Sequence, residues 1–167
     1  EEILVRRFTL LFEELGVDAD GVAAKRSYEW NLGGSYFYIE GAEALLEEMS
    51  KKYDLYVMSN GTASVQDRRI EASGIAKYFK DIFISEKIGY NKPSIEFFDR
   101  CFARIPGFKK DEAIIIGDSL SSDIQGGINA GIKTCWVNPN HRPVREEIIP
   151  DFEIETLPQL LPILNAL

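Results

Sequence analysis

The stretch Ile114-Ile115-Ile116-Gly117-Asp118-Ser119 decides the fold of this chain. An apolar run that stops at a glycine and is followed at once by a carboxylate is typical of a buried parallel strand ending at the rim of a sheet. A second carboxylate, Asp123, follows five positions after Asp118. Ligands of open α/β folds bind beyond the carboxyl ends of the strands, and carboxylate oxygens are ligands that Mg²⁺ prefers. The pair therefore predicts a magnesium site at this rim.

From Tyr38 onward, helical and strand patterns alternate along the chain. The predicted strands cover 54–58, 81–85, 113–116, 133–137 and 152–154, and the predicted helices cover 41–52, 62–73, 94–105, 121–130 and 157–167. Right-handed crossovers join successive parallel strands, so the alternation predicts an α/β fold built on a doubly wound parallel sheet.

Residues 1–37 contain no strand pattern. Apolar residues recur at helical spacing up to Gly16, and a second helical pattern, from about 19 to 30, ends before Gly33-Gly34. We interpret residues 1–37 as a helical appendage that is joined through a Gly33-Gly34 hinge to a core of residues 38–167.

The composition excludes several classes of partner. The chain has 167 residues and a formal net charge of −8, which argues against a nucleic acid polymer or an anionic membrane surface as a partner. Cys101 and Cys135 lie among apolar residues, as expected for free thiols in a reducing, cytoplasmic setting. The chain has one histidine, His141, which limits histidine-based catalysis. The sequence does not indicate an oligomeric state.

Polar residues follow three of the predicted strands. Ser59-Asn60-Gly61 follows the first strand, Lys92 follows the second in a Gly-Tyr-Asn-Lys-Pro loop, and Asp118 ends the third. Ser59 and Asn60 can donate hydrogen bonds to phosphate oxygens, and the Lys92 ammonium can neutralise a phosphoryl group. Asp118 would coordinate the metal ion, and Asp123 would hold metal-bound water or orient Lys92. Together they predict divalent-metal phosphate chemistry.

Each of these residues also has a simpler explanation. Ser59-Asn60-Gly61 has the composition of an ordinary turn, Lys92 taken alone reads as an exposed lysine, and Asp123 could cap its helix. Asp118 is harder to explain away, because a carboxylate that ends an apolar strand is costly unless it is paired.

The segments Val57-Met58-Ser59-Asn60-Gly61, Gly89-Tyr90-Asn91-Lys92-Pro93 and Ile116-Gly117-Asp118-Ser119, the last with Asp123, resemble the second, third and fourth motifs of the haloacid dehalogenase-like (HAD) hydrolase superfamily. The resemblance runs from about Tyr38 to Asn138. Residues 1–37 resemble half of that family's helical cap. Ile105-Pro106, Gly126-Gly127 and the stretch from Thr134 to Pro139 resemble its pyrimidine 5′-nucleotidase branch.

The resemblance implies an enzyme that cleaves a small phosphorylated metabolite, such as a nucleoside 5′-monophosphate, with Mg²⁺ as cofactor. Ser59 and Lys92 would be catalytic, Asn60 and Gly61 would bind the phosphoryl group, and Asp118 and Asp123 would serve the metal. In such enzymes an aspartate attacks phosphorus to form an aspartyl-phosphate, and a second aspartate two positions later acts as general acid and base.

The nucleophile motif of that family is missing from the sequence. The single Asp-x-Asp, Asp18-Ala19-Asp20, follows Gly16-Val17 at a helix junction and not a core strand. We expect the core to lack its first strand, which in the family lies between the strands that end at Ser59 and Asp118. We therefore expect the native polypeptide to begin upstream, and the chain as given to be inactive.

Three other functions stay open. Gly117-Asp118-Ser119-Leu120 spells the signature of GDSL-type esterases, in which Ser119 would be the nucleophile and His141 its base. A haloacid dehalogenase would share the fold but attack carbon without a metal. A pseudo-enzyme would keep the phosphate pocket without a nucleophile. Mg²⁺ dependence separates the phosphatase from the dehalogenase.

Overall fold

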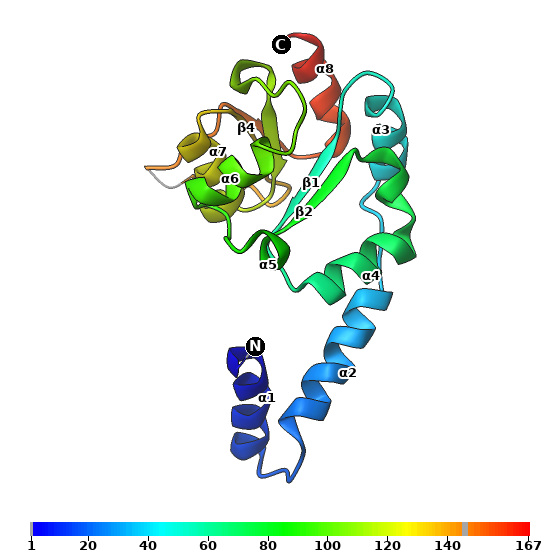
Figure 1. Cartoon of the computed structure of the whole chain (residues 1–167), viewed down its shortest axis with the longest axis vertical. Helices are drawn as coiled ribbons and strands as arrows, with labels where there is room; N and C mark the ends of the chain where they lie inside the picture. The colour runs from blue at the N-terminus through cyan, green and yellow to red at the C-terminus, as the bar shows by residue number, and fades with distance from the viewer. Residues whose placement is uncertain (1, 145–146) are drawn as a thin grey trace. The chain divides into compact units, whose positions relative to one another are not determined.

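The computed structural model describes residues 2–144 and 147–167 (Figure 1). It divides into two compact units. The first unit holds the chain up to Phe37 together with Ser64–Ala76, and the second holds Tyr38–Ala63 and Lys77–Leu167. The segment Ser64–Ala76, expected to belong to the core, thus packs with the helical residues before Tyr38.

The first unit is helical. It contains α1 (Glu2–Leu15), α2 (Gly21–Gly34) and most of α4 (Ala63–Ser73). Asp20 caps α2, since its side chain accepts a hydrogen bond from the backbone N–H of Val22 at 2.8 Å. A Cβ atom on Gly21 would lie 2.5 Å from the Thr9 hydroxyl oxygen, so glycine is needed for the close approach of α2 to α1.

The expected Gly33-Gly34 hinge is instead the last turn of α2. A Cβ atom on Gly33 would lie 3.2 Å from the carbonyl oxygen of Val65, so this glycine serves the close packing of α2 against α4. The guanidinium carbon of Arg68 lies 3.2 Å from the ring centroid of Trp30 in the same contact. The two glycines therefore relieve crowding between helices.

The second unit contains all the strands. The strand β1 (Tyr56–Ser59) pairs in parallel with β2 (Asp81–Ile84), and β3 (Ile114–Gly117) pairs in parallel with β4 (Lys133–Val137), which pairs in parallel with β5 (Phe152–Ile154). The predicted α/β class with parallel strands is thus confirmed.

The strands form two separate ladders, β1-β2 and β3-β4-β5. In the described part of the chain, four strands have one edge that pairs with no other strand: β1 and β2 in the first ladder, and β3 and β5 in the second. That the family's first strand would lie between the strands that end at Ser59 and Gly117 stays a prediction.

Helices cover both faces of the strands, as a doubly wound fold requires. Ile115 packs in a core cluster with side chains of α6 (Ile95–Phe102), whereas Ile114 and Ile116 pack against the cluster that holds residues of α3 (Ala42–Met49) and α8 (Leu160–Asn165). This alternation is the period of a strand buried on both faces. The remaining helical elements are α5 (Ser85–Ile88), α7 (Gln125–Ala130), η1 (Ile75–Tyr78), η2 (Lys110–Glu112), η3 (Leu120–Ile124) and η4 (Leu157–Gln159).

The pair Gly126-Gly127 allows α7 to lie directly against its neighbours. A Cβ atom on Gly126 would lie 2.6 Å from the Phe98 ring, and one on Gly127 would lie 2.5 Å from the Ile115 side chain. Cys101 and Cys135 are buried free thiols, as predicted. Among the helices of the described residues, none is both long and apolar enough to cross a bilayer.

Candidate active site

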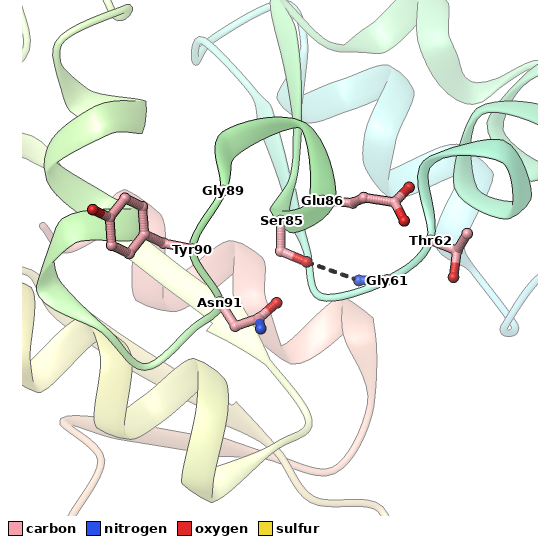
Figure 2. Close-up of a pocket in the computed structure, with 7 residues that line it drawn as sticks. All are labelled: Gly61, Thr62, Ser85, Glu86, Gly89, Tyr90 and Asn91. Carbon is pink, nitrogen blue, oxygen red and sulfur yellow. Dashed lines mark hydrogen bonds between the residues drawn. The ribbon is translucent and has the colours of Figure 1, made fainter. Parts of the chain in front are cut away.

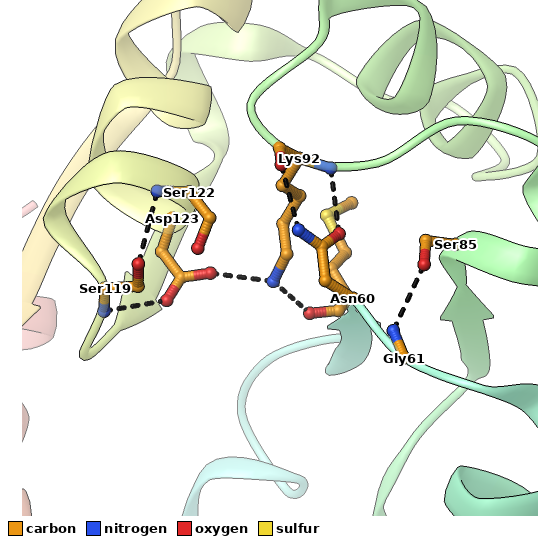
Figure 3. Close-up of polar contacts among 8 residues, drawn as sticks. Asn60, Gly61, Ser85, Lys92, Ser119, Ser122 and Asp123 are labelled. Atoms are coloured by element: carbon orange, nitrogen blue, oxygen red, sulfur yellow. Dashed lines mark hydrogen bonds and ion pairs between the residues drawn. The ribbon is translucent and has the colours of Figure 1, made fainter. Parts of the chain in front are cut away.

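A buried ion pair lies at the carboxyl ends of the strands. The Lys92 ammonium lies 2.7 Å from Oδ1 of Asp123, and the residues are only 9% and 7% exposed (Figure 3). The same ammonium donates a hydrogen bond to the carbonyl oxygen of Met58, in β1. Burial excludes the interpretation of Lys92 as an exposed lysine, and the ion pair joins the loops after β2 and β3.

Local backbone geometry explains where Asp123 points. It lies in η3, a single π-helical turn whose N-cap is Ser119, so Ser119 and not Asp123 caps this turn. The backbone N–H of Ser119 donates to Oδ2 of Asp123 at 3.0 Å. A Cβ atom on Gly117 would lie 2.4 Å from the carboxyl carbon of Asp123, so glycine is required at the end of β3.

Asn60 ties the loop after β1 to the backbone of Lys92. Its Oδ1 accepts from the Lys92 N–H at 2.8 Å, and its Nδ2 donates to the Lys92 carbonyl at 2.9 Å (Figure 3). The backbone N–H of Gly61 donates to the Ser85 hydroxyl at 3.1 Å. These contacts fix the loops relative to one another, and phosphate binding by Asn60 and Gly61 stays a prediction.

Ser59 and Asp118 differ from these engaged groups. Ser59 is the last residue of β1 and is half-buried, and its hydroxyl has no hydrogen bond to any residue that the structure describes. Asp118 is exposed, and no side chain or N–H in the described ranges 2–144 and 147–167 donates to its carboxylate. Both groups are thus available to a ligand beside the Lys92–Asp123 pair.

The donor set at this rim fits a magnesium ion. Among the described residues, no three histidine, cysteine, aspartate or glutamate side chains are grouped so that they could hold a metal ion together. Mg²⁺ is commonly held by one or two carboxylates, completed by water and substrate phosphate. Asp118 offers a free carboxylate. Asp123 follows five residues later in the chain, and each of its two carboxylate oxygens accepts one hydrogen bond. Two oxygen-donor residues are enough for this ion.

A cavity of about 390 Å³ opens next to these loops. It is lined by Gly61, Thr62, Ser85, Glu86, Gly89, Tyr90 and Asn91 (Figure 2). Glu86 also caps α4, because its Oε2 accepts from the Ala63 N–H at 2.7 Å. The sequence patterns did not predict α5 or the role of Glu86, although a carboxylate just after an apolar strand is the kind of signal that revealed Asp118.

The geometry expected of an esterase is not present. The Ser119 hydroxyl accepts from the Ser122 N–H at 3.3 Å, and Nδ1 of His141 faces Oε1 of Glu155 at 3.7 Å. No hydrogen bond joins Ser119 to His141, and both residues are described. Ser119 therefore lacks the contact with His141 that the esterase interpretation requires.

Similarity to known proteins extends over nearly the whole chain. It is 42% identical over 165 residues to the HAD-hydrolase YfnB of Bacillus subtilis, covering 99% of this chain and 70% of that protein. It is 37% identical over 166 residues to the pyrimidine 5′-nucleotidase PynA of Streptococcus pneumoniae, and this match covers 99% of this chain and 70% of PynA.

Solved structures agree with the sequence matches. A crystal structure of YfnB bound to magnesium superposes with a TM-score of 0.92 at 43% identity, covering 98% of this chain and 72% of that one. A 2-haloacid dehalogenase from Pseudomonas syringae superposes with a TM-score of 0.77 at 28% identity, and the match covers 99% of this chain and 71% of the dehalogenase. The profile of the haloacid dehalogenase-like hydrolases matches residues 12–137, and the chain belongs to that family.

Proposed function

We propose that the full-length protein is a Mg²⁺-dependent phosphomonoester hydrolase that acts on nucleoside 5′-monophosphates or similar small phosphate esters. The observation that carries this proposal is the buried Lys92–Asp123 pair at 2.7 Å, with the free Ser59 hydroxyl and the free Asp118 carboxylate beside it at the strand ends. The similarity to PynA, which is named a pyrimidine 5′-nucleotidase, supports this substrate class.

Each residue has a distinct part in this proposal. The Lys92 ammonium neutralises charge on the transferring phosphoryl group, and the Ser59 hydroxyl donates a hydrogen bond to one of its oxygens. Asp118, with Asp123, would hold Mg²⁺, which when bound offsets the negative charge of the phosphate. Phosphoryl transfer depends mainly on positioning and charge neutralisation, which rigidly held loops supply.

We further propose that a strand carrying an Asp-x-Asp pair fills the interruption between β1 and β3. Support comes from the unpaired edges of those two strands in the described chain, since open inner edges leave backbone groups without partners. The first aspartate would attack phosphorus as the ester P–O bond breaks, and the second would protonate the leaving alcohol. Water would then cleave the aspartyl-phosphate. Without that strand, residues 1–37 as a partial cap and 38–167 as an incomplete core would be inactive.

The cavity suits the alcohol part of the substrate. Gly61 and Asn91 line it and are the chain neighbours of Asn60 and Lys92, which supports a role for the cavity beside the proposed phosphoryl site. The Asn91 amide, the Thr62 hydroxyl and the outer oxygen of Glu86 can bond hydroxyl and amide groups of a nucleoside. The negative charge of Glu86 disfavours a second anionic group there.

One observation favours a second function. The superposition on a 2-haloacid dehalogenase is at 28% identity, so this chemistry is the alternative. A dehalogenase needs no metal, and the free carboxylate of Asp118 has no part in such a reaction.

The test uses the full-length gene product. It is assayed with pyrimidine and purine nucleoside 5′-monophosphates, and separately with 2-chloropropionate, each with Mg²⁺ and with EDTA. We expect phosphate release that needs Mg²⁺ and no halide release. Halide release in EDTA would replace the proposal with the dehalogenase, and phosphate binding without turnover would replace it with a pseudo-enzyme.

A further inference from the structure

One peptide group at the site is held at both ends by side chains. The carbonyl oxygen of Asp118 accepts hydrogen bonds from Nε1 of Trp136 at 3.1 Å and from Nη2 of Arg142 at 2.8 Å. The N–H of the same peptide group, on Ser119, donates to Oδ2 of Asp123 at 3.0 Å. Three side chains from separate segments therefore fix the orientation of the peptide that follows the Asp118 side chain.

Arg142 is itself held in place. Oδ1 of Asn138 accepts from the Arg142 N–H at 2.9 Å, and Nδ2 of Asn138 donates to the Arg142 carbonyl at 3.0 Å. Asn138 is fully buried, and its Nδ2 also donates to Glu153 at 2.6 Å. The guanidinium carbon lies 5.7 Å from the Trp136 ring centroid. The loop after β4 thus presents Arg142 to Asp118 through contacts that leave little freedom.

The contacts form a line of alternating charge. The Arg142 cation polarises the Asp118–Ser119 peptide, which strengthens its N–H as a donor to the Asp123 carboxylate, and Asp123 in turn binds the Lys92 ammonium. Arg142 is thus connected through this peptide to Asp123 and Lys92.

We propose that Arg142 is a positioning residue that sets the direction of the Asp118 carboxylate for Mg²⁺ and steadies Asp123 through the shared peptide. The inference rests on the proposed function, because it takes Asp118 as a magnesium ligand. Groups that orient a metal ligand from outside typically change metal affinity by about 10- to 100-fold.

The chain offers a matched control in Arg104. Its Nη2 lies 2.9 Å from Oδ2 of Asp81, and its guanidinium carbon lies 5.1 Å from the Phe83 ring centroid. Arg104 and Arg142 are both exposed arginines with one Nη2 hydrogen bond and one aromatic neighbour. Of these two arginines, only Arg142 contacts the Asp118 peptide. The variant Arg104→Gln therefore reports the general cost of losing an exposed arginine with such contacts.

The experiment compares Arg142→Gln, Arg142→Lys and Arg104→Gln with the wild-type full-length protein. Three quantities are measured: the Mg²⁺ concentration for half-maximal phosphatase activity, the rise in melting temperature on adding Mg²⁺, and KM at saturating Mg²⁺. We expect Arg142→Gln to raise the half-maximal Mg²⁺ concentration about tenfold, to reduce the Mg²⁺-dependent rise in melting temperature, and to leave KM unchanged. Arg142→Lys, which keeps the charge, should recover part of the loss, and Arg104→Gln should match wild type.

The outcomes separate this inference from the proposed function. If wild type hydrolyses the ester and is stabilised by Mg²⁺, but Arg142→Gln has the Mg²⁺ requirement of Arg104→Gln, only the inference is overturned. A rise in KM with an unchanged Mg²⁺ requirement also overturns it, because Arg142 would then contact the substrate. A wild-type protein that neither hydrolyses phosphate esters nor responds to Mg²⁺ overturns both.

Discussion

Nζ of Lys92 and Oδ1 of Asp123 are 2.7 Å apart, and both side chains are about nine-tenths buried. In such a pair, removing one partner leaves an uncompensated buried charge, which typically costs about 3–5 kcal/mol, whereas removing both costs much less. The ion pair is therefore expected to couple strongly in stability as well as in activity.

Lys92→Met should lower the free energy of unfolding by about 3 kcal/mol or more, because Asp123 remains buried without a counter-charge. The double variant Lys92→Met/Asp123→Leu should be destabilised by clearly less than the sum of the two single variants. Urea unfolding of all four proteins measures the coupling. Additive effects within about 0.5 kcal/mol would show that the pair is not coupled in solution.

Gly117→Ala should impair the site more than the fold. The new Cβ atom would lie 2.4 Å from the carboxyl carbon of Asp123 and would displace it from Lys92. Gly127→Ala is the control, since its Cβ atom would meet Ile115 at 2.5 Å, beneath α7. Each of these two variants should lose about 1–3 kcal/mol in free energy of unfolding through overpacking.

The two variants should differ in phosphatase activity. Phosphatase activity, measured well below the melting temperature of each variant, should fall strongly only for Gly117→Ala. Equal activity in the two variants would show that the position of the Asp123 carboxylate does not matter.

The meeting of Lys92 and Asp123 could be predicted from sequence, because each follows an apolar strand and parallel strands bring their carboxyl ends to one rim. Periodicity also predicted the strands and the longer helices to within a few residues. It could not predict that Asn60 would bond the Lys92 backbone, or that Arg142 would reach Asp118, since these contacts depend on how loops far apart in the chain pack. Gly33 was misread as a hinge for the same reason: close helix packing and a flexible joint both call for glycine.

Glu86→Gln should alter selectivity in the cavity. Glutamine can still accept the hydrogen bond from the Ala63 N–H, so α4 stays capped, but the negative charge is lost. The ratio of kcat/KM for a nucleoside 3′,5′-bisphosphate to that for the 5′-monophosphate should rise about three- to tenfold, the effect of removing a partly screened repulsion. Glu96→Gln, on the exposed side of α6, is the control. An unchanged ratio in Glu86→Gln would place the alcohol part of the substrate elsewhere.

The two cysteines should be inert in the folded protein. Burial raises the pKa of the Cys101 thiol to about 12 and that of Cys135 to about 11. Labelling with iodoacetamide at pH 8 should be slow in the native state and rapid after unfolding, because the thiolate is the reactive form. Rapid native labelling of both residues would contradict their burial.

The same pKa values predict an alkaline loss of stability. Thiols of the unfolded chain ionise near pH 8.5, whereas those of the folded chain hold their protons to about pH 11–12. The unfolded state therefore binds fewer protons above pH 8.5, and stability should fall as the pH rises from about 9 to about 12. Cys135→Ala should show a shallower fall than wild type in urea unfolding across this range. An identical slope would mean that Cys135 ionises equally in both states.

The most direct test of a single Mg²⁺-dependent phosphate site at these strand ends is the activity of Asp118→Asn in the full-length protein. The substitution keeps the size of the side chain but removes the charge from its free carboxylate. Phosphate release from a nucleoside 5′-monophosphate should fall on the order of a hundredfold or more, whereas Asp99→Asn, at an exposed position of α6, should retain it. Wild-type Mg²⁺-dependent activity in Asp118→Asn would contradict the account.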